Sequence, residues 1–336
     1  MRAAVFQGGG AVSVVDRSDP SITAADEVLI GVEVNGLCGS DLRAFAVPPQ
    51  MAYDQGVVVG HEFAGRVIEV GSAVTSVRGG DRVIAIPNIN CQVCWSCRTN
   101  RTNLCDGFVH IGSMRDGGAA EYTVVPERLI LEIPEGLPTD LAALAEPLAC
   151  VLNGTTKVGA QPGDTVLVLG GGPIGLLYLL LFKGAGATVV VSEPSELRAK
   201  AALEFGADLV VDPMSVDVGE AVRQATHGLG ADIAIDAVGS LLEDAVSLVR
   251  KGGTVLVFGL DDRATASISP STLAYGEICL QGIYIAKGTF PKALQLLESN
   301  ELGFDRLITH RLELERFNEA VDLARSGEAL KVLIVP

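Results

Sequence analysis

One short glycine-rich segment constrains the fold of this chain more than any other feature. Gly170-Gly171-Gly172-Pro173-Ile174-Gly175 matches the pattern GxGxxG, follows the apolar run Thr165–Leu169 and opens a segment of helical pattern. In this pattern the first glycine permits a tight turn, the second lets the backbone approach a pyrophosphate, and the third lets helix and strand pack closely. These roles fall to Gly170, Gly172 and Gly175. A flexible turn without a ligand is the alternative.

The surroundings of this segment favour a dinucleotide. A helix that begins at Pro173 and Ile174 directs unpaired N–H groups and partial positive charge at phosphates. Glu193 ends the next strand about 20 residues later, where an acid binds the ribose hydroxyls of NAD. Its charge should repel the extra phosphate of NADP, so NAD is the expected cofactor. Arg198 would favour NADP if it paired with that phosphate. The alternative is that Arg198 is a solvated helix residue.

Strand-length and helix-length segments alternate after Pro162-Gly163-Asp164. The apolar runs are continuous, as in strands buried on both faces, so the pattern predicts a doubly wound parallel sheet. Ligands lie beyond the carboxyl ends of such strands, which places Phe258 and Leu260 beside the nicotinamide. The expected strands are Thr165–Leu169, Thr188–Val191, Asp208–Val211, Asp232–Ile235 and Thr254–Phe258.

The first part of the chain, up to about residue 150, has a different pattern, which predicts a compact β-barrel or sandwich. After about Lys287 two helical stretches precede a final strand, Lys331–Val335. The length of 336 residues suits two domains, and the predicted class is α/β. The expected early strands include Glu27–Val34, Glu62–Val70, Asp81–Ile86 and Ala119–Val125.

Composition excludes several classes of function. A net charge of −16 argues against a nucleic-acid binder or a ligand of anionic membranes. The most apolar stretch, Leu176–Phe182, is far shorter than the ~20 residues of a membrane span. No signal-peptide pattern is visible at the N-terminus. We therefore expect a soluble, cytoplasmic protein.

Four of the seven cysteines lie within one short segment, at Cys91, Cys94, Cys97 and Cys105. Four thiolates this close can surround Zn²⁺ as a tetrahedron, and such a closed site is structural because it leaves no open position. We expect a structural zinc lobe over residues 88–106. An iron–sulfur cluster fits less well, because seven residues before the last cysteine do not match the bacterial ferredoxin spacing. Free thiols are the other alternative.

Four further residues have the chemistry of a second metal site: Cys38, His61, Glu62 and Glu146. A catalytic zinc takes three protein ligands of such types and keeps one position for water or substrate. Each residue also has a structural explanation, as a core residue or a surface acid. Spacing alone cannot bring positions 38, 61 and 146 together.

Together these motifs resemble the zinc-containing medium-chain dehydrogenase/reductase family, in particular its sorbitol (polyol), 2,3-butanediol and threonine dehydrogenase branch. The resemblance spans essentially the whole chain. It implies a GroES-like catalytic domain over 1–149 and 287–336 and a Rossmann domain over 150–286. The motifs are CGSD from Cys38, GHE around His61, the four-cysteine lobe, EPL from Glu146, and GGGPIG.

The resemblance also implies the roles of the site residues. Cys38, His61 and a carboxylate from Glu62 or Glu146 would hold the catalytic zinc, and Asp41 would orient His61. Ordinary-alcohol members of the family often have cysteine in place of Glu146, which favours a polyol-like substrate. Zinc would stabilise the alkoxide, and hydride would pass to NAD.

Ser40 is the expected hydroxyl relay for the alcohol proton, or alternatively a helix N-cap. Arg43 stands where many relatives have a histidine that passes the proton outward; arginine cannot act as a base. It is instead expected to contact the cofactor phosphates or an acidic substrate group. The segment Ala46–Tyr53 looks shorter than in common sorbitol dehydrogenases, which argues against sorbitol itself.

The expected function is therefore oxidation of a secondary alcohol (polyol, cyclitol or sugar-like) to a ketone, with two zinc ions per chain. Threonine and 2,3-butanediol are alternative substrates, and a catalytically silent dinucleotide-binding protein or a cysteine-based redox sensor are alternatives of another class. The resemblance implies a homodimer or homotetramer assembled through the Rossmann sheet edge. The remaining histidines and cysteines are expected to be structural or surface histidines and core cysteines: His110, His227, His310, Cys150 and Cys279.

Overall fold

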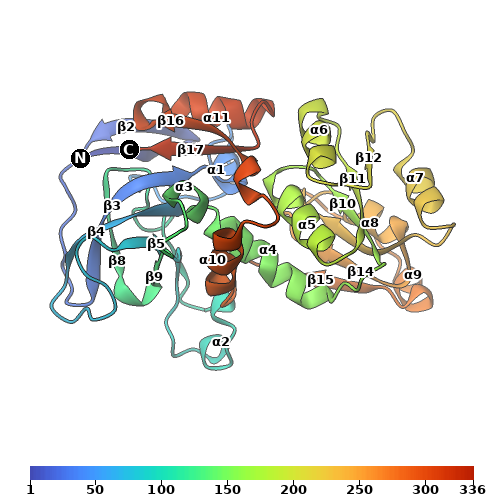
Figure 1. Cartoon of the computed structure of the whole chain (residues 1–336), viewed down its shortest axis with the longest axis horizontal. Coiled ribbons are helices and arrows are strands. Elements are labelled where there is room, and N and C mark those ends of the chain that lie inside the picture. Colours follow the sequence, from blue (N-terminus) through green and yellow to red (C-terminus); the bar gives the residue numbers. More distant parts are fainter. The chain divides into compact units, whose positions relative to one another are not determined.

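The computed structural model describes all 336 residues and divides the chain into two compact units. Unit 1 comprises Met1–Ala149 and Ala286–Pro336, and unit 2 comprises Cys150–Ile285. Both chain ends belong to unit 1 (Figure 1). None of the helices combines the length and apolar character needed to cross a membrane.

Unit 2 is built on a six-stranded parallel sheet with the order β12-β11-β10-β13-β14-β15. The order reverses at β10, which pairs with β11 on one side and β13 on the other, so ligands should bind beyond the carboxyl ends of these strands. The strands are β10 (Thr165–Leu169), β11 (Thr188–Ser192), β12 (Leu209–Val211), β13 (Ala231–Asp236), β14 (Val249–Val257) and β15 (Cys279–Gly282).

Helices connect these strands, as expected for a doubly wound sheet (Figure 1). The central strands are apolar along their whole length because both faces are buried; Val166 to Val168 and Val189 to Val191 are fully covered. The helices are α4 (Ala145–Val158, which begins in unit 1), α5 (Pro173–Gly184), α6 (Glu196–Glu204), α7 (Val218–Ala225), α8 (Leu242–Leu248) and α9 (Pro270–Gly276). The α/β class and the doubly wound sheet are thus confirmed.

Two features of unit 2 were not foreseen. β14 begins five residues before the expected strand, and β15 adds an edge strand. Cys279 opens β15 and is exposed, so its interpretation as a core cysteine is wrong. An edge strand has one unpaired side, and its side chains are not enclosed as those of β10 and β11 are. Cys150 is buried in α4 as expected.

Unit 1 is organised around β3 (Glu27–Gly36), which pairs antiparallel with β4 (Glu62–Val70), β8 (Tyr122–Pro126) and the C-terminal β17 (Lys331–Val335). Two larger apolar cores lie in the unit, one around Phe45 and Phe317 and the other around Ile30 and Phe63, with a smaller cluster around Val5 and Val58. The other strands are β1 (Arg2–Gly8), β2 (Ala11–Asp16), β5 (Arg82–Ala85), β6 (Asn88–Ile89), β7 (Val109–His110), β9 (Ile130–Glu132) and β16 (Ile308–Glu313).

The helices of unit 1 are short. The C-terminal segment contributes the two expected helices, and it also contributes β16, which the sequence pattern did not indicate. The α-helices are α1 (Gly39–Ala44), α2 (Trp95–Arg98), α3 (Thr139–Ala142), α10 (Phe290–Ser299) and α11 (Phe317–Ser326).

Candidate metal centres and cofactor site

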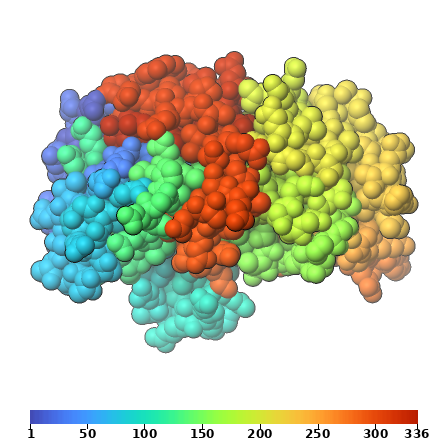
Figure 2. Space-filling model, in the orientation of Figure 1, coloured from blue at the N-terminus to red at the C-terminus, as the bar shows by residue number.

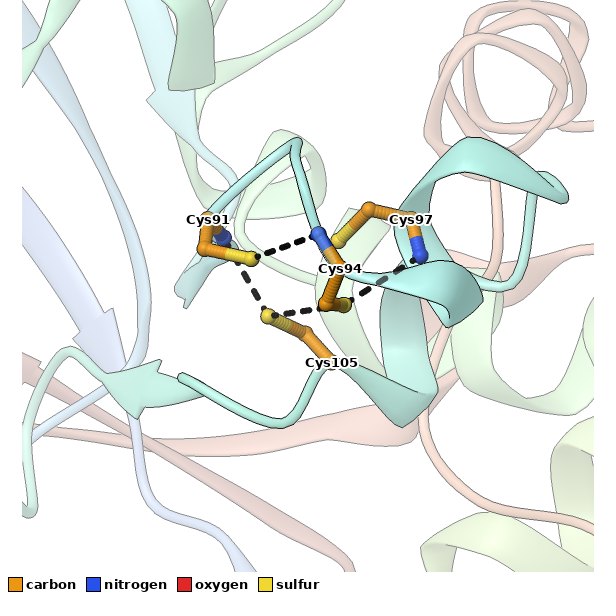
Figure 3. Close-up of side chains that lie close together, drawn as sticks. All are labelled: Cys91, Cys94, Cys97 and Cys105. Atoms are coloured by element: carbon orange, nitrogen blue, oxygen red, sulfur yellow. Dashed lines mark hydrogen bonds between the residues drawn. The ribbon is translucent and has the colours of Figure 1, made fainter.

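The four clustered cysteines meet in a lobe that stands out from the surface of unit 1 (Figure 2). Their sulfur atoms all lie within 4.8 Å of one another. Backbone N–H groups point at the sulfurs: Cys94 N–H donates to Cys91 Sγ at 3.3 Å, and Cys91 N–H to Cys105 Sγ at 3.2 Å (Figure 3). α2 begins after Cys94, and its first turn brings the N–H of Cys97 to Cys94 Sγ.

Electrostatics explain why this lobe suits a cation. Hydrogen bonds from the backbone of Cys94 and Val93 lower the pKa of Cys91 to about 6. Burial among the other sulfurs raises the pKa of Cys97 to about 12. Four thiolates cannot share so small a volume without a positive charge between them, so the donor set fits a tetrahedral Zn²⁺ that leaves no open position.

A second cluster lies inside unit 1, where the candidate ligand atoms of Cys38, His61 and Glu62 are within 4.8 Å of one another. The pairing of β3 with β4 creates it. Gly36 lies opposite Glu62 in the ladder, and Cys38 follows as the N-cap of α1. Glycine at position 36 leaves room for the Glu62 carboxylate, because a Cβ atom there would displace Glu62 Oε2.

Asp41 lies behind His61 and is almost fully buried. Its Oδ2 accepts the Cys38 N–H at 2.9 Å, and its Oδ1 lies 3.6 Å from His61 Nδ1. Burial raises the pKa of Asp41. For His61, burial acts to lower the pKa, but the negative charges of Asp41 and Cys38 outweigh it and raise the pKa well above its ordinary value. The acidic groups around His61 thus favour a positive charge at this position, which a metal cation would supply.

Lys331 is a component of this site that sequence reasoning missed. It begins β17, is buried, and forms an ion pair with Glu62 while its Nζ donates to the carbonyl oxygen of Leu37 at 3.0 Å. Burial acts to lower the pKa of Lys331, but the charges of Glu62 and Cys38 raise it. The only signal in the sequence was a lysine at the start of an otherwise apolar strand.

The other predicted residues of the site lie nearby. Glu146 is buried in the first turn of α4; it lies outside the compact Cys38–His61–Glu62 set, yet its charge contributes to raising the pKa of both His61 and Lys331. Ser40 is half-buried in the first turn of α1. Because Cys38 is the N-cap of that helix, the N-cap alternative for Ser40 is wrong.

His110 lies closer to this site than the sequence suggested. Its ring centroid is 4.9 Å from that of His61, and its Nδ1 is 2.9 Å from Ser113 Oγ. Burial and the neighbouring His61 lower the pKa of His110 to about 3, so its imidazole is neutral. His110 is thus a structural histidine, as expected, and it lies beside the metal-ligand cluster without belonging to it. His110 belongs to no sequence motif. It lies in the short strand β7, and only the fold brings it beside His61.

In unit 2 the glycine-rich segment joins β10 to α5 with the geometry that its pattern requires. Gly170 has φ +101°, a backbone conformation that favours glycine, and a Cβ at Gly175 would lie 1.8 Å from the Gly170 carbonyl oxygen. Gly172 is the N-cap of α5, with Pro173 and Ile174 in its first turn. The free N–H groups of this turn can bind a phosphate.

Glu193 lies against this turn. Its carboxylate accepts the N–H of Gly171 at 2.7 Å and the N–H of Ser195 at 2.8 Å, and it is buried. Arg198 lies in α6, half-buried, and its Nε has no hydrogen-bond partner. The acid at the end of β11 and the arginine one helical turn after Ser195 thus lie on neighbouring elements.

Asp236, which sequence reasoning missed, ends β13 beside this turn. It is fully buried and accepts the N–H groups of Val238, Gly239 and Leu241 at 2.7–3.0 Å. These bonds hold the loop after β13, whose Gly239 packs on Gly259; a Cβ at Gly259 would lie 2.2 Å from the Gly239 nitrogen.

The two residues predicted beside the nicotinamide follow β14, as expected. Phe258 is half-buried and packs edge-on against Tyr178 at 5.5 Å, and Leu260 is exposed.

Comparison with known proteins is decisive for the family. Residues 24–135 match the alcohol dehydrogenase GroES-like domain, and residues 173–299 match the zinc-binding dehydrogenase model. The chain is 32% identical to a sorbitol dehydrogenase from Halalkalibacterium halodurans over 335 residues, which cover 98% of this chain and 97% of the relative.

The chain belongs to the zinc-binding dehydrogenase family. This dehydrogenase is also 34% identical to an L-threonine 3-dehydrogenase from Thermococcus kodakarensis, over 92% of this chain and 91% of the relative. A crystal structure of a putative zinc-binding dehydrogenase from Sinorhizobium meliloti, bound to NADP, superimposes with a TM-score of 0.94 at 34% identity and covers 100% of this chain and 99% of that one. The expected family and GroES-like domain are confirmed, and the protein is an oxidoreductase of the alcohol dehydrogenase type.

Proposed function

We propose that this dehydrogenase oxidises a secondary alcohol of the polyol, cyclitol or sugar-like class to a ketone, and that NAD accepts the hydride. The observation that carries the proposal is the cluster of half-buried Cys38 with buried His61 and Glu62, in which a thiol, an imidazole and a carboxylate converge. These ligand types are those of a catalytic zinc with one open position. Zinc bound there would act as a Lewis acid that lowers the pKa of the alcohol hydroxyl.

The residues of the chain would divide the remaining work. Cys38 and His61 would bind the metal at all times, and Glu62 or Glu146 would complete the ligand set; the ion pair with Lys331 holds Glu62 when it is not a ligand. Ser40 would accept the proton of the alcohol and pass it to water or to a ribose hydroxyl. Arg43 cannot take this role because it stays protonated.

The cofactor preference follows from Glu193. A carboxylate at the end of β11 suits the ribose hydroxyls of NAD and repels the additional phosphate of NADP. The relative from Sinorhizobium meliloti binds NADP, and Arg198 offers a cation for that phosphate, so the ratio between the two cofactors is the quantity to measure.

The proposal extends to the second metal, the assembly and the location. Cys91, Cys94, Cys97 and Cys105 would hold a structural zinc. The edge strand β15, with exposed Leu280 and with Tyr275 and Tyr284 exposed nearby, would pair with a second copy in a homodimer or homotetramer. Cysteines that must stay reduced suit the cytoplasm.

A substrate screen with metal analysis tests the proposal. Purified protein should contain two zinc ions per chain and should reduce NAD with at least one polyol, cyclitol, sugar or diol. The variant Cys38→Ser should lose one zinc and the activity, whereas Cys279→Ser, an exposed cysteine in unit 2, should lose neither. Turnover of L-threonine alone would assign the substrate class of the threonine dehydrogenases instead. Absence of turnover with every compound in protein that holds two zinc ions would favour a silent dinucleotide-binding protein.

A further inference from the structure

Tyr53 lies behind the proposed catalytic metal site. It ends the segment Ala46–Tyr53, and its side chain is buried. The ring packs edge-on against Phe6 and Phe45, with centroid distances of 5.8 and 6.1 Å. This aromatic packing holds the ring without any need for the hydroxyl group.

The hydroxyl group contacts two side chains, Asp41 and Ser40, and the bond to Asp41 is the short one. Tyr53 Oη donates to Asp41 Oδ1 at 2.7 Å, a short hydrogen bond between two buried side chains. Burial and the nearby Asp41 raise the pKa of Tyr53 well above its ordinary value, so the hydroxyl keeps its proton and remains a donor. A phenol buried without a partner would be destabilising, so a tyrosine at this position is explained by its contact with Asp41.

The Asp41 carboxylate is consequently held at both oxygens. The backbone N–H of Cys38 binds Oδ2 at 2.9 Å, and Tyr53 binds Oδ1. Two bonds at opposite ends prevent the carboxylate plane from rotating about its bond to Cβ. The oxygen that Tyr53 holds is also the one that lies 3.6 Å from His61 Nδ1.

The Oδ1 atom of Asp41 is the acceptor available to His61 Nδ1. This nitrogen is a buried polar atom without a hydrogen-bond partner, and Asp41 Oδ1 is the oxygen that faces it. A metal-bound imidazole almost always donates its other ring N–H to an acceptor, which selects the tautomer and orients the ring. The position of Asp41 Oδ1 therefore decides how His61 presents its second nitrogen to a metal.

We propose that Tyr53 is a positioning residue of the metal centre, whose hydroxyl group holds Asp41 in the orientation that aligns His61 for metal binding. The chain Tyr53–Asp41–His61 connects the end of the segment Ala46–Tyr53 to a metal ligand. This inference rests on the proposed zinc site at Cys38 and His61.

The variant Tyr53→Phe tests this role, because it removes the hydroxyl group and keeps the aromatic packing. We expect zinc affinity at one of the two sites to fall about 10-fold, the lower end of what loss of an outer partner costs a metal site. The lobe site should keep its affinity and serves as an internal reference. Affinities are measured on the full chain by competition with a chromophoric chelator.

Two further measurements separate positioning from mere packing. The absorption spectrum of the Co²⁺-substituted protein should change in Tyr53→Phe, because the imidazole is no longer held in one orientation. Asp41→Asn should also weaken the same site, and the double variant Tyr53→Phe/Asp41→Asn should be no weaker than Asp41→Asn alone, because both changes act through one chain of contacts. Tyr178→Phe, which removes a buried hydroxyl from unit 2, should leave both zinc affinities unchanged.

The outcomes are distinct. Wild-type affinity at both sites in Tyr53→Phe, or additive losses in the double variant, would overturn the positioning role while the proposed function stands. If the wild-type chain binds only the zinc of the lobe, the proposed catalytic site fails, and this inference fails with it.

Discussion

The buried ion pair between Lys331 and Glu62 gives the sharpest quantitative expectation. Lys331→Met removes the ammonium group, keeps a side chain of similar length, and leaves Glu62 buried without its cationic partner. Two unit charges about 3 Å apart attract by about 5 kcal/mol at an effective dielectric constant of about 20. Removal of the lysine also removes the cost of its own burial. Measured losses for broken buried pairs are about 3–5 kcal/mol, and we expect the free energy of unfolding to fall by that amount.

The measurement is urea or thermal unfolding of metal-depleted protein at neutral pH, followed by circular dichroism. Metal is removed because zinc would supply Glu62 with a positive charge in place of Lys331. For a unit of this size the loss corresponds to a melting temperature lower by about 6–20 °C. Lys183→Met is the matched control: its pair with Asp208 is partly exposed and should contribute about 1 kcal/mol or less.

A second variant checks the cause. Glu62→Gln/Lys331→Met removes both charges together and should recover most of the lost stability, since an uncharged pair no longer leaves an isolated buried charge. The reasoning is refuted if Lys331→Met is within about 1 kcal/mol of the wild type, or if the double variant is no more stable than the single one.

Four further outcomes are expected. Glu193→Ala should lower kcat/KM for NAD about 10- to 100-fold, which is the usual cost of losing a charge-assisted hydrogen bond, and should shift the preference towards NADP. An unchanged ratio of kcat/KM for NAD to that for NADP would contradict the assigned role. Burial acts to raise the pKa of Glu27, but hydrogen bonds from Thr23, Ala24 and Arg115 lower it from 4.5 to about 2, so stability should fall as the pH falls from about 4.5 towards 2, and Glu27→Gln should flatten this dependence in acid unfolding curves. Gly154→Ala would place a Cβ 2.0 Å from Tyr178 Oη and should lower the free energy of unfolding by about 1–3 kcal/mol. The loss should be smaller in a Tyr178→Phe background, which removes the clashing hydroxyl group without breaking a hydrogen bond. Cys97→Ser should leave one zinc per chain by metal analysis, and two retained ions would rule out the four-thiolate site.

Short-range features could be predicted because they depend on neighbouring residues. The strand before GGGPIG, the turn itself and the start of α5 lie where the pattern indicated, since the glycines are required by local backbone geometry. The four cysteines lie within fifteen residues, so a single loop suffices to bring their sulfurs together. The continuous apolar strands of unit 2 identified the parallel sheet for the same reason.

The exposure of Cys279 and the position of His110 could not be predicted, because both depend on the place of a strand in the fold. A cysteine in an apolar run is buried in a central strand and exposed in an edge strand, and the run is the same in both cases. His110 carries no motif; the short strand β7 alone places its ring beside His61.

The amino-acid sequence by itself determined the two local constructions of this dehydrogenase, the phosphate-binding turn and the cysteine lobe. Only the tertiary structure decided how the catalytic cluster is assembled and what holds it. The register of β3 against β4 brings Glu62 to Cys38, and the pairing of β17 with β3 brings Lys331 to Glu62 from about 270 residues away along the chain. Strand register depends on packing across the whole unit, and local propensity carries no information about such distant partners.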